Sequence, residues 1–402
     1  MAVAAAVVIG AVVIGGVSGI GHDDRPVDAT MSAPTEVPAI PPELGDRRFE
    51  VTVFGRPDAQ PRVVRAGPGF AVVVDDNLTA YGADGVERWH YRPAYTAIDD
   101  VHVYDDGTVL IAALSDSLIA FDAYTGQQLW TSLNEDLRGA FDGYQNSTER
   151  KPYPSLPRLL AQSTGTVMMG FDPRTGEETW RHSRGCSKTA YTPTQLLCLN
   201  MWGDHARVTV VDAATGSAGV DVRVPIPGAG RPETWTFIAE DVDSTGAGVA
   251  MTFWISGSGE QDPSPLVYLN TTSRASVPLG ETSAFGGDPR GDLLVTSPGG
   301  GTVALHDAAG ARRCVISPDA TPVDGEFEAT AWLTDQIIAV FNRGKGFDPE
   351  PSLVVFDRDC RSLSAQPVPA GTDITEVVPA PGATLMVRSD GTGTHIDGYS
   401  PR

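Results

Sequence analysis

One motif recurs from residue 78 to the C-terminus, and it constrains the fold more than any other feature of this chain. Each copy has an apolar run, an anchor residue that is usually aromatic or aliphatic, and a short turn. A second strand follows, and it ends in Trp in the clearest copies, LIAFDAYTGQQLW (118–130) and VMMGFDPRTGEETW (167–180). The other copies lie at 78–89, 208–220, 266–277, 302–314, 353–363 and 393–402. Repetition of this kind predicts similar units that pack side by side around a shared core.

The chemistry of the motif predicts a β-hairpin in every copy. The Asp of the turn accepts hydrogen bonds from turn amides, and the Gly supplies a positive φ. Three copies contain the pairs Asp122 and Gly126, Asp172 and Gly176, and Asp212 and Gly216. The anchor residues are Tyr81, Phe121, Phe171, Val211, Leu269, His306, Phe356 and, near the C-terminus, about Asp397. Their spacing of 37 to 58 residues is typical of a propeller blade.

The two ends of the repeated region predict a closed ring. Another apolar strand precedes each hairpin, but the last copy stops after its third strand. We expect the strand RRFEVTVFG (47–55) to add as the fourth strand of the last blade, because closure removes exposed sheet edges. The sequence therefore predicts an all-β, eight-bladed β-propeller over residues 48–402. Seven blades are the alternative, if the copy at 266–277 is an insertion.

The segments AFDAYTGQQLW and GFDPRTGEETW resemble the quinoprotein-type (PQQ-like) β-propeller repeat. Two groups share that repeat: the quinoprotein dehydrogenases, and proteins similar to propeller lipoprotein B of the outer-membrane β-barrel assembly machinery. The resemblance implies that the Trp of each repeat packs on the neighbouring blade. Trp89, Trp130 and Trp180 are accordingly expected to be structural residues.

The features of the quinoprotein enzymes are missing from the sequence. Those enzymes have two adjacent cysteines above the quinone, a Ca²⁺ site and an Asp base, whereas no two cysteines are adjacent here. The chain also has no C-x-x-C, no H-E-x-x-H, no G-x-S-x-G and no Walker loop. We therefore expect no catalytic residues, no metal and no cofactor, and we expect the protein not to be an enzyme.

The N-terminus predicts a membrane anchor. Residues 2–20 form an uncharged run that spans roughly 28 Å as a helix, close to the hydrocarbon thickness of a bilayer. A cleavable signal peptide is the alternative, although a basic n-region is missing. Residues 1–20 are thus expected to be a transmembrane anchor, and the Pro-rich acidic segment 21–47 an extended linker.

Charge and cysteines indicate the environment of the protein. With 51 Asp and Glu against 29 Lys and Arg, the net charge of −22 argues against nucleic acid as a partner. An even number of cysteines behind an apolar N-terminus favours an oxidising compartment. We expect the disulfides Cys186–Cys198, across one turn, and Cys314–Cys360, between neighbouring blades. Four unpaired buried thiols are the alternative.

Three long inserts are the candidate interaction surfaces: 136–157, 256–265 and 342–352. Tyr144, Tyr153 and Phe347 are their candidate aromatic contacts. The sequence thus predicts a membrane-anchored, extracytoplasmic and monomeric propeller. We expect it to act as a scaffold that binds other proteins in a bacterial envelope, such as an actinobacterial one. The alternatives are a ligand-binding or sensor ectodomain and, less favoured, a PQQ-dependent oxidoreductase.

Overall fold

The fold consists almost entirely of antiparallel β-sheet. We describe a computed structural model of the chain. It describes residues 28–29, 36–55, 61–93, 96–147, 160–163, 167–183, 185–192, 194–202, 204–226, 236–244, 248–256, 265–280, 283–287, 292–296, 303–316, 326–342, 351–368, 372–389 and 393–401. Within these ranges the strands form eight sheets, and there is one α-helix, α1 (Glu135–Ser147). Each sheet contains the strands of one sequence copy, so the copies fold as similar units.

Sheets 1 to 4 follow the chain from β3 to β17. Sheet 1 contains β3 (Arg62–Ala66), β4 (Gly69–Val74), β5 (Asn77–Gly82) and β6 (Glu87–Tyr91), with β1 (Asp28–Ala29) paired outside β6. Sheet 2 contains β7 (Ile98–Tyr104), β8 (Val109–Leu114), β9 (Leu118–Asp122) and β10 (Gln128–Ser132), with a 3-10 turn at Asp105–Gly107. Sheet 3 contains β11 (Leu160–Ser163), β12 (Met168–Phe171) and β13 (Glu178–His182). Sheet 4 contains β14 (Lys188–Tyr191), β15 (Gln195–Trp202), β16 (His205–Asp212) and β17 (Ala218–Pro225).

Sheets 5 to 8 complete the set. Sheet 5 contains β18 (Thr236–Ser244), β19 (Gly248–Ser256), β20 (Leu266–Asn270) and β21 (Ser276–Gly280). Sheet 6 contains β22 (Ser283–Gly287), β23 (Leu293–Thr296), β24 (Val303–His306) and β25 (Arg312–Ile316). Sheet 7 contains β26 (Glu326–Trp332), β27 (Gln336–Asn342), β28 (Pro351–Asp357) and β29 (Ser362–Pro367). Sheet 8 contains β30 (Asp373–Ala380), β31 (Ala383–Ser389), β32 (Thr394–Ser400) and β2 (Asp46–Val53).

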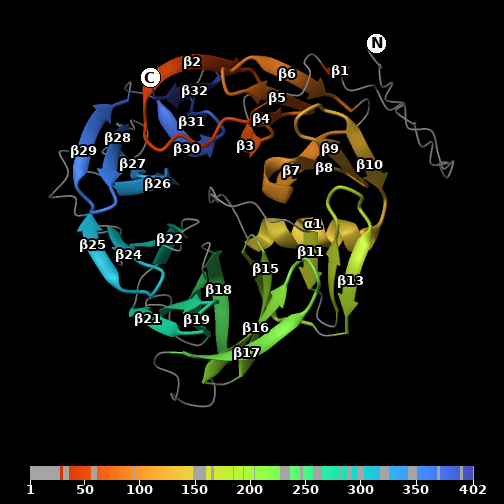
Figure 1. The fold of residues 1–402 in the computed structure, drawn as a ribbon, viewed down its shortest axis with the longest axis vertical. Helices are drawn as coiled ribbons and strands as arrows, with labels where there is room; N and C mark the ends of the chain where they lie inside the picture. The colour runs from red at the N-terminus through yellow and green to blue at the C-terminus, as the bar shows by residue number, and fades with distance from the viewer. Residues whose placement is uncertain are drawn as a thin grey trace, which may run out of the picture.

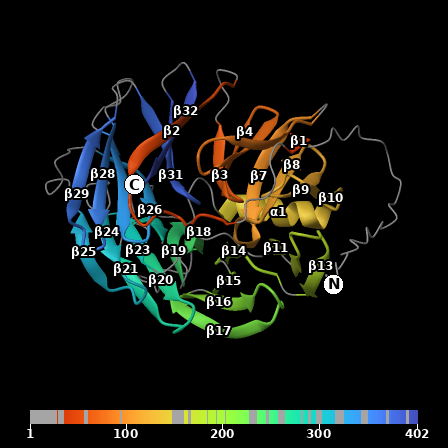
Figure 2. The same cartoon turned by 45° about the horizontal axis from the view of Figure 1, so that its top comes forward.

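The sheets stand in a ring, as a β-propeller requires. The first strand of a sheet lies toward the centre and the last strand toward the rim (Figure 1). The turned view shows the same ring from another angle (Figure 2). Buried apolar clusters fill the spaces between neighbouring sheets; one of them joins sheets 1 and 2 through Leu110, Phe121 and Trp89. The core is therefore distributed around the ring.

The N-terminal strand closes the ring. β2 pairs antiparallel with β32, so sheet 8 combines residues from both ends of the chain. Phe49 of β2 lies opposite Gly398 of β32, just as Trp180 lies opposite Gly170 in sheet 3. Phe49 thus takes the place of the missing Trp in the last copy. This register makes Tyr399, one residue after Gly398, the anchor of that copy. The sequence placement near Asp397 was two residues too early.

The helix α1 was not predicted. We expected an irregular insert over 136–157, but a helix begins at Glu135. The side chain of Asn134 accepts hydrogen bonds from the amides of Asp136 (2.9 Å) and Leu137 (3.4 Å), as an N-cap does. Leu137 and Phe141 are fully buried on one face of the helix. α1 packs along β11, where the four-stranded sheets have their innermost strand (Figure 1).

The segment before β2 lies against the ring. The carbonyl of Ala39 accepts a hydrogen bond from the amide of Gly382 (2.9 Å), and that of Pro42 accepts one from Asp335 (3.0 Å). The amide of Leu44 donates to Gln336 Oε1 at 2.8 Å. This part of the expected linker is therefore packed on sheets 7 and 8. Residues 2–20, the expected anchor, lie outside the described residues, and no helix among the described ones is long and apolar enough to cross a bilayer.

Candidate functional site

The Trp of each clear copy fastens its sheet to the next one. The indole Nε1 of Trp89 donates to the carbonyl of Ala123 (3.2 Å), and that of Trp180 donates to Ala213 (2.8 Å). Trp130 makes the equivalent bond to Pro173 at 2.9 Å. In each case the acceptor directly follows the Asp of the next turn. These residues are structural, as the family resemblance implied.

The turn glycines leave space for these rings. Gly176 and Gly216 have φ values of 72° and 68°. A Cβ on Gly216 would lie 2.6 Å from the Trp180 ring, and one on Gly176 would lie 3.1 Å from Trp130. Asp122, Asp172 and Asp212 hold the turns through their side-chain oxygens, each accepting at least one backbone amide. Glycine is required at these positions both for its φ and for its lack of a side chain.

Both cysteine pairs predicted from the sequence are disulfides in the structure. Cys186–Cys198 joins the start of sheet 4 to its second strand. Cys314–Cys360 joins β25 of sheet 6 to the turn of sheet 7. Cys314 stands at the Trp position, and Cys360, with φ 61°, stands where Gly310 stands in the preceding turn. The disulfide therefore replaces the Trp-to-turn contact between these two sheets.

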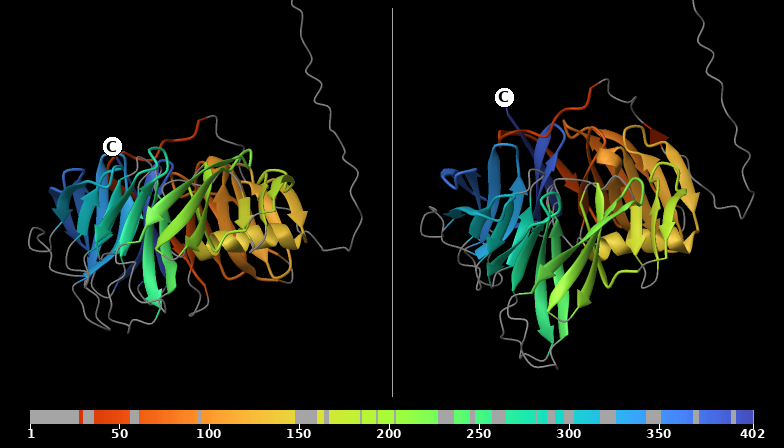
Figure 3. Two further views of the ribbon diagram at one scale, coloured as in Figure 1. Left: turned by 90° about the horizontal axis from the view of Figure 1, so that it is seen from below. Right: turned by 60° about the horizontal axis from the view of Figure 1, so that its bottom comes forward.

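The strand order gives the ring two unlike faces. The motif turns and the first-to-second strand turns lie on one face, which we call the turn face. The connections between sheets and the second-to-third strand connections lie on the other, which we call the loop face. The left panel of Figure 3 shows the ring edge-on. The strand ends that flank the long connections, Ser256 with Leu266 and Asn342 with Pro351, are all on the loop face.

Large exposed apolar residues also occur on the loop face. Phe54 follows β2 and is 75% exposed, Leu133 follows β10 and is 64% exposed, and Trp202 ends β15 and is 58% exposed. Among the side chains whose exposure the structure describes, Phe54 and Trp202 are the two exposed aromatic ones. Neither residue was predicted as a contact, although Phe54 directly follows a strand of alternating polar and apolar residues, which is a usable signal.

The structure describes only one of the three aromatic residues that we predicted as contacts. Tyr144 lies within α1, where we had expected an irregular loop. Tyr153 and Phe347 lie outside the described residues. The structure thus replaces one predicted loop by a helix that runs in from the rim (Figure 1).

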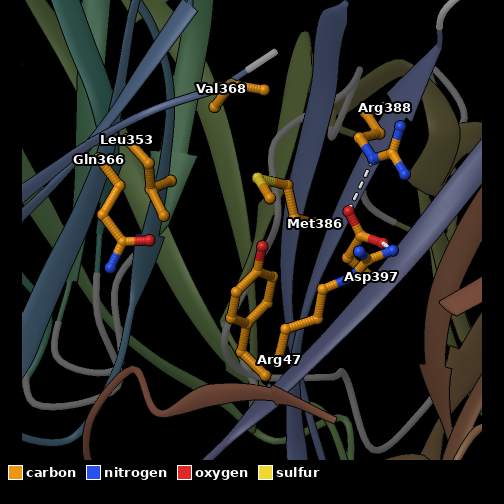
Figure 4. Close-up of a pocket in the computed structure, with 8 residues that line it drawn as sticks. Arg47, Leu353, Gln366, Val368, Met386, Arg388 and Asp397 are labelled. Atoms are coloured by element: carbon orange, nitrogen blue, oxygen red, sulfur yellow. Dashed lines mark hydrogen bonds and ion pairs between the residues drawn. The ribbon is translucent and has the colours of Figure 1, made fainter. Parts of the chain in front are cut away.

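A cavity of about 150 Å³ lies between sheets 7 and 8, beside the ring closure (Figure 4). Leu353, Val368 and Met386 give it an apolar wall, and Arg47, Arg388 and Asp397 give it a charged one. Gln366 and Tyr399 complete the lining. Burial and the charge of Asp397 raise the pKa of Tyr399, so its hydroxyl remains a hydrogen-bond donor.

The charges around this cavity balance. Asp397 is 3% exposed. It accepts a hydrogen bond from Arg388 Nε (2.7 Å) and forms an ion pair with Arg47 Nη2 (2.6 Å). Glu50 contacts the same two arginines at 2.8 and 2.6 Å, and His395 Nδ1 at 2.8 Å. Two carboxylates therefore face two guanidinium groups, and β2 contributes one of each. The network stabilises the junction of the chain ends, and the cavity carries no unbalanced charge.

The ring, the motif turns and the Trp contacts are those of a β-propeller whose repeats resemble the PQQ-like type. Residues 74–221 match the family model of the outer membrane protein assembly factor BamB, so the chain resembles BamB over that region. No curated protein sequence matches the chain at a significant level.

Three solved structures of other proteins align with most of this chain at low sequence identity. A eukaryotic initiation factor structure aligns at 11% identity with a TM-score of 0.49, covering 90% of this chain and 91% of that one. The Dos1 propeller aligns at 12% identity and 0.46, covering 89% and 95%. The dihydro-heme d1 dehydrogenase NirN, in complex with DHE, aligns at 10% identity and 0.47, covering 84% and 76%.

Proposed function

We propose that this protein is a non-enzymatic scaffold: an eight-bladed propeller, one blade per sheet, that binds other proteins in the bacterial cell envelope. The single observation that carries the proposal is the contrast between its two faces. The loop face has the long connections and the exposed Phe54 and Trp202. The turn face has short turns and is crossed by the chain's own residues 38–44.

The physical argument is that aromatic side chains supply much of the energy of protein interfaces. An exposed Trp that becomes buried against a partner contributes large apolar area at a low entropic cost. Loops on a rigid ring vary without disturbing the core, so the loop face is free to match a partner. The match to an outer membrane assembly factor supports the same class of function.

The envelope location is part of the proposal. Two disulfides favour an oxidising compartment, and the apolar segment 2–20 would hold the ring at the outer side of the membrane. Deleting residues 2–20 is expected to move the protein from the membrane fraction to the soluble fraction. Retention of the shortened chain in carbonate-washed membranes would contradict this anchor.

Photo-crosslinking in the native cells tests the interaction face. A benzophenone amino acid in place of Phe54 or Trp202 should give a discrete protein adduct. The same probe in place of Asp359, which is exposed on the turn face, serves as the matched control. Adducts of equal yield at all three positions, or none at Phe54 and Trp202, would reject the loop face as the binding surface.

A further inference from the structure

The interface between sheets 7 and 8 differs from those that a Trp joins. In sheet 3, Trp180 pairs with Gly170, the residue before the anchor. In sheet 7 the residue before the anchor is Val355, and Ser364 pairs with it. Ser364 therefore stands at the Trp position, and its short side chain cannot reach the next sheet as an indole does. The cavity of about 150 Å³ lies at this interface.

The wall of this cavity is apolar where it is buried and polar where it is exposed. Leu353 and Met386 are only 3% and 5% exposed. Gln366 is exposed, and Tyr399 is half-buried. Leu353 and Gln366 lie on one side of the cavity and Arg388 on the other, with Met386 between them (Figure 4). A ligand would therefore place an apolar part inside and a polar group outside.

The charged part of the wall favours an uncharged ring. Asp397 lies 2.7 Å from Arg388 and 2.6 Å from Arg47, and Glu50 lies 2.8 and 2.6 Å from the same two arginines. Because these charges balance, an ionic ligand would lose its hydration without gaining a counter-charge. The carboxylates engage the edges of the guanidinium groups, whereas their planar faces stack on aromatic rings. The thioether of Met386 also makes favourable contacts with such rings.

The size of the cavity and two polar groups of its wall define the ligand further. An engineered apolar cavity of roughly 150 Å³ takes up benzene, so this cavity has the size of one six-membered ring. The side-chain amide of Gln366 and the hydroxyl of Tyr399 form no hydrogen bond within the described part of the chain. A hydroxyl on the ring donates and accepts, as both of these groups do. An aromatic ring with one hydroxyl, a phenol, fits these features.

The direction of the polarity distinguishes a free phenol from a tyrosine side chain of a partner. A tyrosine enters a cavity hydroxyl first, which would press its hydroxyl against Leu353 and Met386 without a hydrogen bond. A free phenol enters ring first and leaves its hydroxyl beside Gln366 and Tyr399. The cavity therefore suits a small molecule better than a side chain.

We propose that the cavity between sheets 7 and 8 is a binding site for a small uncharged phenol. The ring packs on Leu353 and Met386 and against the guanidinium face of Arg47. The hydroxyl of the ligand forms hydrogen bonds with Gln366 and Tyr399. The site does not depend on protein binding at the loop face.

The test follows 4-fluorophenol by fluorine NMR, with the purified full-length chain at about pH 7, where a phenol is uncharged. We expect a saturable change of the fluorine signal that corresponds to one site. Phenol should reverse the change by competition, whereas cyclohexanol, which is not planar, and benzoate, which is charged, should not. Tyr399→Phe should weaken binding about 5-fold, because one hydrogen bond is lost.

A pair of matched variants tests the location of the site. Gln366→Trp places an indole from the chain itself at the cavity and should abolish saturable binding. Gln127→Trp, the same substitution at an exposed position in the motif hairpin of sheet 2, should bind like the unchanged protein. Unfolding temperatures of all variants separate loss of binding from loss of structure.

Several outcomes would overturn the proposal. They are the absence of saturable binding, equal competition by phenol and cyclohexanol, equal binding by the two Trp variants, and unchanged binding by Tyr399→Phe. Tighter binding of N-acetyltyrosinamide than of 4-fluorophenol would also overturn it, because a partner's tyrosine would then be the better occupant.

Discussion

At the scale of single residues, the contact between a Trp and the next turn explains most of what the sequence predicts. Asp, Gly and Trp recur because turn geometry and ring packing both depend on them, as at Gly216 beneath Trp180. Other residues also connect neighbouring strands and sheets at the Trp and Gly positions. Phe49 and Cys314 stand at Trp positions, and Cys360 stands at a turn Gly position. Their role could not be read from the sequence, because equivalence to Trp or Gly appears only once the sheets are side by side.

Trp180 provides the first prediction. It is 8% exposed, and its removal would leave a cavity between sheets 3 and 4. Trp180→Ala should lower the free energy of unfolding by about 3–5 kcal/mol. Trp180→Phe should cost about 1–2 kcal/mol, because it loses the bond to Ala213 but keeps an aromatic ring. Chemical denaturation measures both. The exposed Trp202→Ala is the control, and equal effects at the two positions would be inconsistent with this role.

Glu376 provides a pH-dependent prediction. Glu376 lies on β30, where burial raises the pKa of its carboxyl from an ordinary value of 4.5 to about 7, against the opposing effect of Arg62. The folded state therefore binds the proton more tightly than the unfolded state. The contribution of Glu376 therefore favours folding below pH 4.5 and is lost as the pH rises to about 7. Glu376→Gln should be more stable than the unchanged protein by about 3 kcal/mol at pH 8, with the difference vanishing near pH 4. A pH-independent difference in denaturation midpoints would refute this assignment.

At the scale of elements, the hairpins could be predicted from the sequence, whereas α1 could not. The spacing of Leu137 and Phe141 and the cap at Asn134 are helix signals. In the sequence they lie inside a long insert with several glycines and prolines, which favours an irregular loop. The helix forms because its apolar face is buried in the space beside β11, and this space exists only in the assembled ring.

The disulfide between sheets 6 and 7 gives a prediction at this scale. It closes a segment of 46 residues, whereas Cys186–Cys198 closes 12. In the chain-entropy model, the longer segment is stabilised by about 1 kcal/mol more. Replacing Cys314 and Cys360 by Ala should therefore cost about 3–4 kcal/mol, and replacing Cys186 and Cys198 somewhat less. Thermal unfolding of the two double variants gives the comparison, and the reverse order would argue against this account.

At the scale of the whole molecule, the ring depends on the junction of its ends. The sequence predicts the closing strand correctly at 47–55, close to β2 (Asp46–Val53). It does not reveal the charge network around Asp397, because Arg47 and Glu50 meet Arg388 and Asp397 only through closure.

Asp397 tests the junction. Asp397→Ala leaves Arg388, whose side chain is only 13% exposed, without its buried partner. The free energy of unfolding should fall by about 3 kcal/mol. Asp204→Ala breaks an ion pair with Arg223 in which Asp204 is 62% and Arg223 65% exposed. This substitution should change the free energy of unfolding by less than about 1 kcal/mol. Denaturant titration of both variants measures the two changes in the free energy of unfolding. Losses of similar size would show that burial at the junction is unimportant.

The pairing of β2 with β32 also sets the order in which the protein is completed. Residues 46–53 are synthesised long before residues 394–400. Until β32 is made, β2 has no partner and the ring stays open. In a chain that lacks residues 394–400, the unpaired β2 is exposed to proteases and to other chains. Closure thus makes the finished ring depend on one segment made early in synthesis and one made late.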